Sequence, residues 1–123
     1  MENKLTFRYL VTAPDLNAHG SLHGSVLLRW IDEAAGMHAR KLTNRVCVTR
    51  HIAAVNFVSK AGLGDIVRIE VSILACGTTS LTFKAEIYED ISMRSIASVG
   101  CIVFVSIDHK GNPVKHGVIH HDK

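Results

Sequence analysis

One segment of this 123-residue chain has the apolar period of a long helix, and the segments after it alternate as strands do. In residues 25–42, apolar side chains recur at every third or fourth position and gather on one side of a helical wheel, opposite Arg29, Glu33 and Arg40. One helix can cover only one face of a sheet. The chain is therefore constrained to an α+β fold of two layers, with one helix packed on one sheet.

Five segments are expected to form that sheet. Apolar–polar alternation and the turns that interrupt it predict strands at residues 5–12, 46–59, 66–75, 81–88 and 95–107. Short connections favour antiparallel neighbours, so we expect the last four strands to form a meander. The sheet has free edges, and Ala35, Gly36 and Ala39 leave room beside the helix for another chain or a ligand. These two features predict a homodimer.

The composition indicates one ordinary globular domain. Apolar residues make up 47% of the chain and charged residues 20%, which excludes a disordered chain. We expect a single domain over residues 1–115, followed by a disordered polar tail at 116–123. No apolar run is long enough to span a bilayer, and the first residues do not resemble a signal peptide. We therefore expect a cytoplasmic protein without membrane insertion.

The charge of the chain and its His and Cys residues argue against nucleic-acid binding, metal binding and disulfides. The net charge of +3 is small and the basic residues are scattered, so no nucleic-acid partner is expected. The chain has 8 His, but no pair shows HxxxH or HExxH spacing on the predicted helix, so neither a metal nor another cofactor is expected. Cys47, Cys76 and Cys101 lie in apolar segments and are expected to be reduced core thiols.

The residues around the start of the helix are the candidates for chemistry. The sequence lacks the motifs of serine and cysteine hydrolases, phosphate-binding loops and dinucleotide-binding folds, so a hydrolase built from it would activate water directly. Asp32 is either a rim carboxylate paired with Arg29 or a partly desolvated general base. Asn17 is either a turn residue or a ligand for substrate or water. Gly24 would present the free N–H groups of the first helical turn to an oxyanion.

Several motifs together resemble the hotdog-fold acyl-CoA thioester hydrolases, most closely the YciA-like and brain acyl-CoA hydrolase types. The resemblance runs from about residue 9 to 113, and order and spacing both agree with it. It rests on PDLNAHG (14–20), HGS (23–25), IDEAAG (31–36), AVNF (54–57), GD (64–65), GTTS (77–80) and DHKGNP (108–113). It implies a hotdog fold, in which a five-stranded antiparallel sheet wraps one long central helix.

The resemblance implies hydrolysis of acyl-CoA to a free carboxylic acid and coenzyme A. Asp32 matches the family's base or nucleophile, and Asn17 matches an asparagine that the partner subunit contributes. Gly24 matches the glycine whose N–H polarises the thioester carbonyl. A second glycine usually follows it in the family. This chain has Ser25 there, which slightly narrows the space at the start of the helix. The minimal active unit implied is a homodimer, commonly assembled into a hexamer as a trimer of dimers.

Other residues are expected to contact the substrate or its coenzyme A. The family's GTTS turn lies near coenzyme A, and Lys60 and Arg94 are chosen by their charge as partners for its phosphates. The expected binding residues are Asn56, Phe57, Lys60, Gly77, Thr78, Thr79, Ser80 and Arg94.

Two other functions stay open at this point. A hotdog enoyl-thioester hydratase or dehydratase would use His19 or His23 for proton transfer. A non-catalytic acyl-CoA-binding domain would bind the thioester without hydrolysing it.

Overall fold

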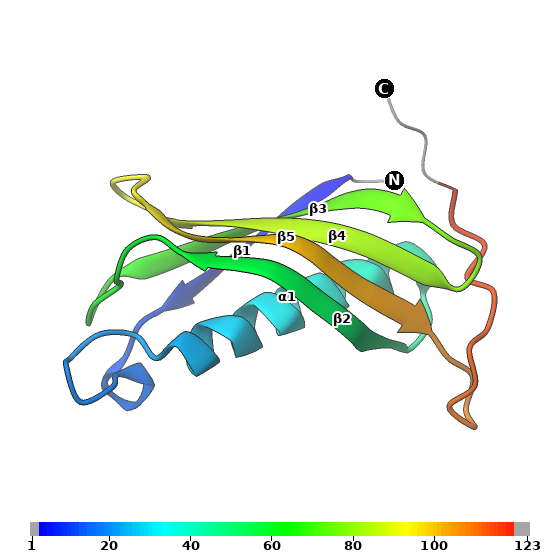
Figure 1. Cartoon of the computed structure of the whole chain (residues 1–123), viewed down its shortest axis with the longest axis horizontal. Coiled ribbons are helices and arrows are strands. Elements are labelled where there is room, and N and C mark those ends of the chain that lie inside the picture. The colour runs from blue at the N-terminus through cyan, green and yellow to red at the C-terminus, as the bar shows by residue number, and fades with distance from the viewer. Residues whose placement is uncertain (1–2, 120–123) are drawn as a thin grey trace.

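A curved sheet wraps one long helix in this protein (Figure 1). The structure is a computed structural model and describes residues 3–119. A short 3-10 helix, η1 (Ala13–Asp15), precedes the long helix α1 (Gly24–Thr43). The strands are β1 (Lys4–Leu10), β2 (Cys47–Phe57), β3 (Ile66–Cys76), β4 (Ser80–Glu89) and β5 (Ser95–Ser106). The predicted architecture of one helix on a five-stranded antiparallel sheet is confirmed.

The order of the strands differs from the predicted meander. The sheet has the order β1-β3-β4-β5-β2, so β3, β4 and β5 follow one another, but β2 pairs with β5 at the far edge. The connection from β2 to β3 spans residues 58–65, which is longer than a tight hairpin turn. It passes round the end of the sheet, and β1 takes the place beside β3 that the meander gave to β2. The prediction of a four-stranded meander was therefore wrong.

Helix α1 extends one residue beyond each end of the predicted segment and is capped by Asn44. Asn44 adopts the left-handed conformation with φ 53°, which an asparagine tolerates, and its N–H donates to the Arg40 carbonyl at 2.8 Å. Thr43 closes the last turn through a hydrogen bond from Oγ1 to the Ala39 carbonyl at 2.8 Å. Among residues 3–119, no helix is both long enough and apolar enough to span a bilayer.

The small residues of α1 pack on the sheet. Ala34, Ala35 and Ala39 are fully buried, and a Cβ on Gly36 would lie 3.3 Å from the Phe104 ring. The absence of a side chain at Gly36 therefore lets the helix approach β5 closely. The chain's own sheet covers Ala35 and Ala39, so these two leave no room for another chain, whereas Gly36 is half-buried and also lines an open groove along the helix.

Two side chains outside the predicted apolar face are also buried. Trp30 stacks on Tyr9 of β1, with the ring centroids 4.8 Å apart and the planes 7° apart. His38 lies against Phe83 of β4, with a centroid distance of 5.0 Å. Both extend the buried stripe toward β1, so the helix covers more of the sheet than aliphatic periodicity indicates. Cys47, Cys76 and Cys101 are free and half-buried, and of the three Cys47 and Cys76 pack against the core.

The segment after β5 is ordered further than expected. His116 is only 8% exposed, and its backbone N–H donates to the Thr78 carbonyl at 3.2 Å. His116 belongs to the predicted tail, and it is hydrogen-bonded to the turn between β3 and β4, while the Val118 N–H donates to His116 Nδ1. Residues 120–123 lie outside the described residues.

Glu89 organises the turn between β4 and β5. One carboxylate oxygen accepts the N–H groups of Ser92 at 2.8 Å and Ile91 at 3.1 Å, and the other accepts the N–H of Ile66 at 3.4 Å. These hydrogen bonds, the one from Ser92 above all, favour the charged form and lower the pKa of Glu89.

The buried inner face of the sheet should dominate stability. Replacing the fully buried Ile69 with alanine leaves a cavity between the sheet and α1, and we expect it to lower the free energy of unfolding by about 2–5 kcal/mol. The same change at Ile91, which is 81% exposed, is the matched control and should stay within about 0.5 kcal/mol of the wild type. Urea unfolding measures both. Equal effects of the two changes would contradict this placement of the core.

The lowered pKa of Glu89 predicts a pH dependence of stability. The group's contribution is complete above the pKa of an unfolded Glu, about 4.3, and is lost as the pH falls through the lower pKa of the folded state. In Glu89→Gln this contribution is absent, so the wild type should exceed the variant in stability at pH 7, and the difference should shrink toward about pH 3. Urea unfolding across this range is the measurement, and parallel profiles would refute the role of the charge.

Candidate functional site

A cavity at the start of α1 brings together several of the predicted residues. It has a volume of about 230 Å³ and is lined by residues of the loop before α1, the first turn of α1 and the connection after β2. Four of the lining residues are among those predicted from the sequence, namely Asn17, Gly24, Phe57 and Lys60. Residues distant in the sequence therefore meet at the end of the sheet where the loop over residues 16–23 lies (Figure 1).

Asn17 is held in one orientation by its own loop. Its side-chain oxygen accepts the N–H of His19 at 2.9 Å, the N–H of Ser21 at 3.1 Å and the Ser21 hydroxyl at 3.3 Å. These bonds occupy the acceptor end, while the amide nitrogen has no hydrogen-bond partner among the residues that the structure describes. Asn17 is therefore both a turn residue and a half-buried donor beside the cavity, so its two predicted roles do not compete.

The start of α1 offers backbone donors to the same cavity. His23 precedes the helix and makes no side-chain capping hydrogen bond. The first-turn N–H groups of an α-helix have no intrahelical acceptor and carry the positive end of the helix dipole. A Cβ on Gly24 would lie in ordinary van der Waals contact with the Phe57 ring, 3.5 Å away, so Phe57 lies beside the backbone at the start of the helix.

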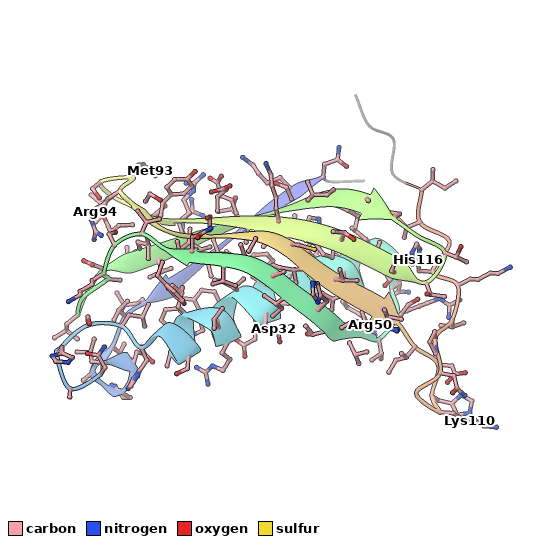
Figure 2. The ribbon with its side chains drawn as sticks, viewed as in Figure 1. Asp32, Arg50, Met93, Arg94, Lys110 and His116 are labelled. Carbon is pink, nitrogen blue, oxygen red and sulfur yellow. The ribbon has the colours of Figure 1, made fainter. Side chains whose placement is uncertain are left out.

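Asp32 lies in the middle of α1, on the side that faces β2 (Figure 2). One of its carboxylate oxygens accepts the Thr49 hydroxyl at 2.5 Å, and no ion pair with Arg29 forms. Asp32 is therefore not paired with Arg29, and it accepts a short hydrogen bond from Thr49 of the sheet instead. A half-buried carboxylate held by one hydroxyl keeps its other oxygen available to accept a proton.

Thr49 was missed in the sequence analysis, because only the shape of β2 brings it to the helix. The side chains of β2 that face α1 or the core are Cys47, Thr49, Ile52, Val55 and Phe57. This order breaks simple alternation twice. The first break coincides with a register shift between Thr49 and His51, and the second with Ala54, whose φ is 57°. No local pattern around Thr49 could have shown this.

One chain does not bring Asp32 and Asn17 into one cavity. Asp32 follows Gly24 by eight residues, which is about 12 Å along a helix axis. Asp32 is also not among the residues that line the Asn17 cavity. The two groups can share a site only if a second chain supplies one of them.

The two cations chosen as phosphate partners have different environments. Arg94 donates to the Ser59 hydroxyl at 2.5 Å and to the Lys60 carbonyl at 2.8 Å, and it lies 3.6 Å from Asp65. It therefore ties the β4–β5 turn to the connection after β2. Lys60 is exposed, lines the cavity and forms no ion pair within residues 3–119. Of the two, Lys60 is the cation that is available to a ligand.

The remaining predicted residues lie elsewhere on the chain. Residues 77–80 form the β3–β4 turn, at the opposite end of the molecule from the cavity (Figure 1). Asn56 is exposed and precedes Phe57 on β2, where neighbouring side chains point to opposite faces. His19 and His23 are exposed in the loop before α1. Among the described residues, no group of three or more His, Cys, Asp or Glu is placed to hold a metal ion.

An open groove runs along the outer side of α1. Its volume is about 680 Å³, and its lining is mostly apolar, with Tyr9, Gly36, Met37 and Val46 among the residues involved. Burial, with a further contribution from the charge of Glu33, raises the pKa of Tyr9, so its phenol stays neutral near pH 7. Met37 is exposed here, whereas Trp30 is buried against Tyr9.

Comparison with known proteins gives consistent matches. Residues 19–96 match the family model described as the thioesterase superfamily. The chain is 29% identical to a Bacillus subtilis protein named as the uncharacterized acyl-CoA thioester hydrolase YkhA, over 92% of this chain and 67% of that protein. It is 25% identical to the acyl-CoA thioester hydrolase YciA of Salmonella typhimurium, over 91% of this chain and 89% of that protein.

Solved structures match over nearly the whole chain. An acyl-CoA hydrolase from Staphylococcus aureus, in complex with butyryl coenzyme A and coenzyme A, superposes with a TM-score of 0.83 and 27% identity, over 99% of this chain and 74% of that one. A hexameric acyl-CoA thioesterase superposes with a TM-score of 0.86 and 26% identity, over 98% and 80%. Further structures of the Staphylococcus aureus protein carry alanine in place of an Asn, an Asp and a Thr, which follow one another at intervals of 15 and 17 residues.

Proposed function

This chain belongs to the thioesterase superfamily, and we propose that it hydrolyses acyl-CoA to a free carboxylic acid and coenzyme A, with Asp32, Asn17 and Gly24 as its catalytic residues. The observation that carries the proposal is the polar arrangement around α1. A carboxylate positioned by Thr49 lies on the helix, while an oriented amide and free backbone donors lie at the helix start.

The spacing of three residues supports these roles. Asn17, Asp32 and Thr49 follow one another at intervals of 15 and 17 residues, the order and intervals at which the Staphylococcus aureus hydrolase was altered. In our chain the Thr49 hydroxyl contacts the Asp32 carboxylate directly. Thr49 is therefore a positioning residue in this proposal, since it acts on the substrate only through Asp32.

Each group has a defined task in the proposed reaction. The N–H of Gly24 and the amide of Asn17 bind the thioester carbonyl, and they stabilise the negative charge that develops on its oxygen. Asp32 takes a proton from water as the water oxygen attacks the carbonyl carbon. The carbon–sulfur bond then breaks, and the thiolate of coenzyme A takes up a proton as it leaves. Direct attack by Asp32, giving a mixed anhydride that water then cleaves, uses the same residues.

The edge strand β2 supports a dimer with two such sites. It has a neighbour on one side only, and Val48, Phe57 and the adjoining Val58 are exposed hydrophobic residues. Pairing of two β2 strands about a two-fold axis is antiparallel, so the end of one strand lies opposite the start of the other. Phe57, at the end of β2, lines the Asn17 cavity, and Thr49, near the start of β2, contacts Asp32. The axis therefore brings the Asn17 cavity of one subunit toward Asp32 of its partner.

Coenzyme A is the remaining part of the substrate. Lys60 at the cavity mouth is the proposed contact for its phosphates, with Arg94 holding the connection that carries Lys60. The turn over residues 77–80 can contribute only from the partner subunit, since it lies at the far end of its own chain. A trimer of dimers is the proposed assembly, by analogy with the hexameric thioesterase. A cytoplasmic location stays a prediction.

Release of free thiol from a panel of saturated acyl-CoAs tests the catalytic roles. We expect Asp32→Asn and Asn17→Ala to lose activity by about a hundredfold or more, because each removes a group that acts on the transition state. Asn112→Ala, in the loop after β5, is the control for Asn17. Full activity of Asp32→Asn would move the base to His19 or His23. Hydration of a 2-enoyl thioester without thiol release would indicate a hydratase, and tight binding without turnover would indicate a binding domain.

Thr49→Val keeps the shape of the side chain and removes only its hydroxyl. Because a hydrogen bond to a charged group contributes about 1.5–3 kcal/mol, we expect roughly a tenfold or larger fall in kcat with little change in KM. Thr82→Val on β4 is the matched control and should leave both constants unchanged. Unchanged kcat in Thr49→Val would remove Thr49 from the proposal while leaving Asp32 in place.

Mixing two inactive variants tests whether the site needs two chains. When Asp32→Asn and Asn17→Ala subunits are unfolded together and reassembled, random pairing makes half of the dimers mixed, and each mixed dimer holds one intact site of two. We therefore expect about a quarter of the wild-type activity to return. A site within one chain would give no recovery.

A further inference from the structure

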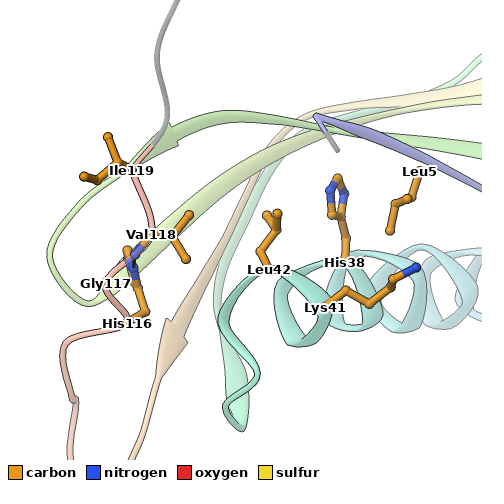
Figure 3. A pocket seen from close by; sticks show the side chains of 8 residues that line it. All are labelled: Leu5, His38, Lys41, Leu42, His116, Gly117, Val118 and Ile119. Carbon is orange, nitrogen blue, oxygen red and sulfur yellow. Dashed lines mark hydrogen bonds between the residues drawn. The ribbon is translucent and has the colours of Figure 1, made fainter. Parts of the chain in front are cut away.

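A separate cavity lies at the end of α1 away from Asn17 and Gly24 (Figure 3). Its volume is about 380 Å³, within the range of small-molecule sites. The last turns of α1, the start of β1 and the segment after β5 line it. Its lining includes Leu5, Lys41, Leu42, His116 and Val118.

Specific hydrogen bonds hold the wall that the segment after β5 forms. The His116 Nε2–H donates to the Ser80 carbonyl at 2.9 Å, and His116 Nδ1 accepts the Val118 N–H at 2.9 Å. The Ser106 hydroxyl donates to the Val114 carbonyl, and the Val114 N–H donates to the Ser106 carbonyl at 2.9 Å. Both nitrogens of His116 are used, so the neutral Nε2–H form of the ring fits this wall. The segment is thus fixed in place over the end of the helix.

The lining combines an apolar body with positive charge. Leu5 and Leu42 approach from β1 and α1, Val118 faces Leu42, and Lys41 extends along the helix with its ammonium on the side of Leu5 (Figure 3). None of the described lining residues is acidic. Lys41 forms no ion pair within residues 3–119. A ligand that matches this lining has an aliphatic part and a single negative charge.

This cavity is distinct from the proposed catalytic groups. Asp32 faces β2 through Thr49, whereas the cavity is bounded by β1, at the other edge of the sheet. The cavity shares no lining residue with the Asn17 cavity or with the groove along α1.

We propose that this cavity is a second ligand site, which binds a monocarboxylate with an aliphatic tail. The ammonium of Lys41 receives the carboxylate, and Leu5, Leu42 and Val118 surround the tail. Free acids of the kind that acyl-CoA hydrolysis releases belong to this class, but the site stands on its own lining and does not depend on the proposed function.

Octanoate is the probe that tests the site on the full-length wild-type protein. Calorimetry should show saturable binding of octanoate, and 1-octanol and acetate should each bind at least about tenfold more weakly, because one lacks the charge and the other lacks the tail. Methyl NMR locates the ligand. We expect octanoate to shift the methyl signals of Leu5, Leu42 and Val118.

A pair of matched charge reversals tests Lys41. Lys41→Glu places a negative charge at the cavity and should weaken octanoate binding at least about tenfold, or about 1.4 kcal/mol. Arg40→Glu makes the same change one residue earlier, outside the lining, and should leave the Kd within about twofold. Both positions are exposed, and thermal unfolding verifies that both variants fold.

Three outcomes would overturn the proposal. Octanoate could fail to bind saturably, the two charge reversals could weaken binding equally, or the shifts could appear only at Leu27 and Ile96, which line the Asn17 cavity. The last result would mean that the acid binds only where a hydrolysis product would lie. Since no thioester is present, these results are independent of whether the protein hydrolyses acyl-CoA.

Discussion

The packing of α1 on the inner face of the sheet is the contact on which the rest of the structure depends. Fully buried alanines and the close approach of Gly36 to Phe104 set the helix directly on β4 and β5. Burial of apolar surface is the main stabilising contribution in a fold of this kind. With that face fixed, Asp32 can lie only at its margin, beside β2, where the Thr49 hydroxyl reaches it.

The same constraint explains why a site would need two chains. The helix and its loop place Asn17 and Gly24 at one end of the sheet, and Asp32 lies about 12 Å further along the helix. The strand beside Asp32 is also the strand with a free edge. A two-fold axis at that edge would join the separated halves, so the feature that leaves one chain incomplete also supplies the surface for the second.

Several polar residues act by positioning others. Arg94 holds the connection that carries Lys60, and Asn17 uses its oxygen to shape the loop that carries its own amide. His116 does the same for the segment that closes the cavity at the far end of α1. Charge and residue type alone made Arg94 and Lys60 equal candidates, and only their hydrogen-bond partners distinguish the two.

The sequence by itself determined the elements and the residues Asn17, Gly24 and Asp32 as candidates, because helical period, strand alternation and loop composition are local properties. Tertiary structure alone decided which strands are neighbours. Strand β2 lies at the edge beside β5, and the connection over residues 58–65 leads from it to β3 near the opposite edge. It also decided the partner of Asp32. Thr49 reaches the helix through irregularities of β2 that depend on sheet pairing and on curvature around α1, and no local pattern encodes them.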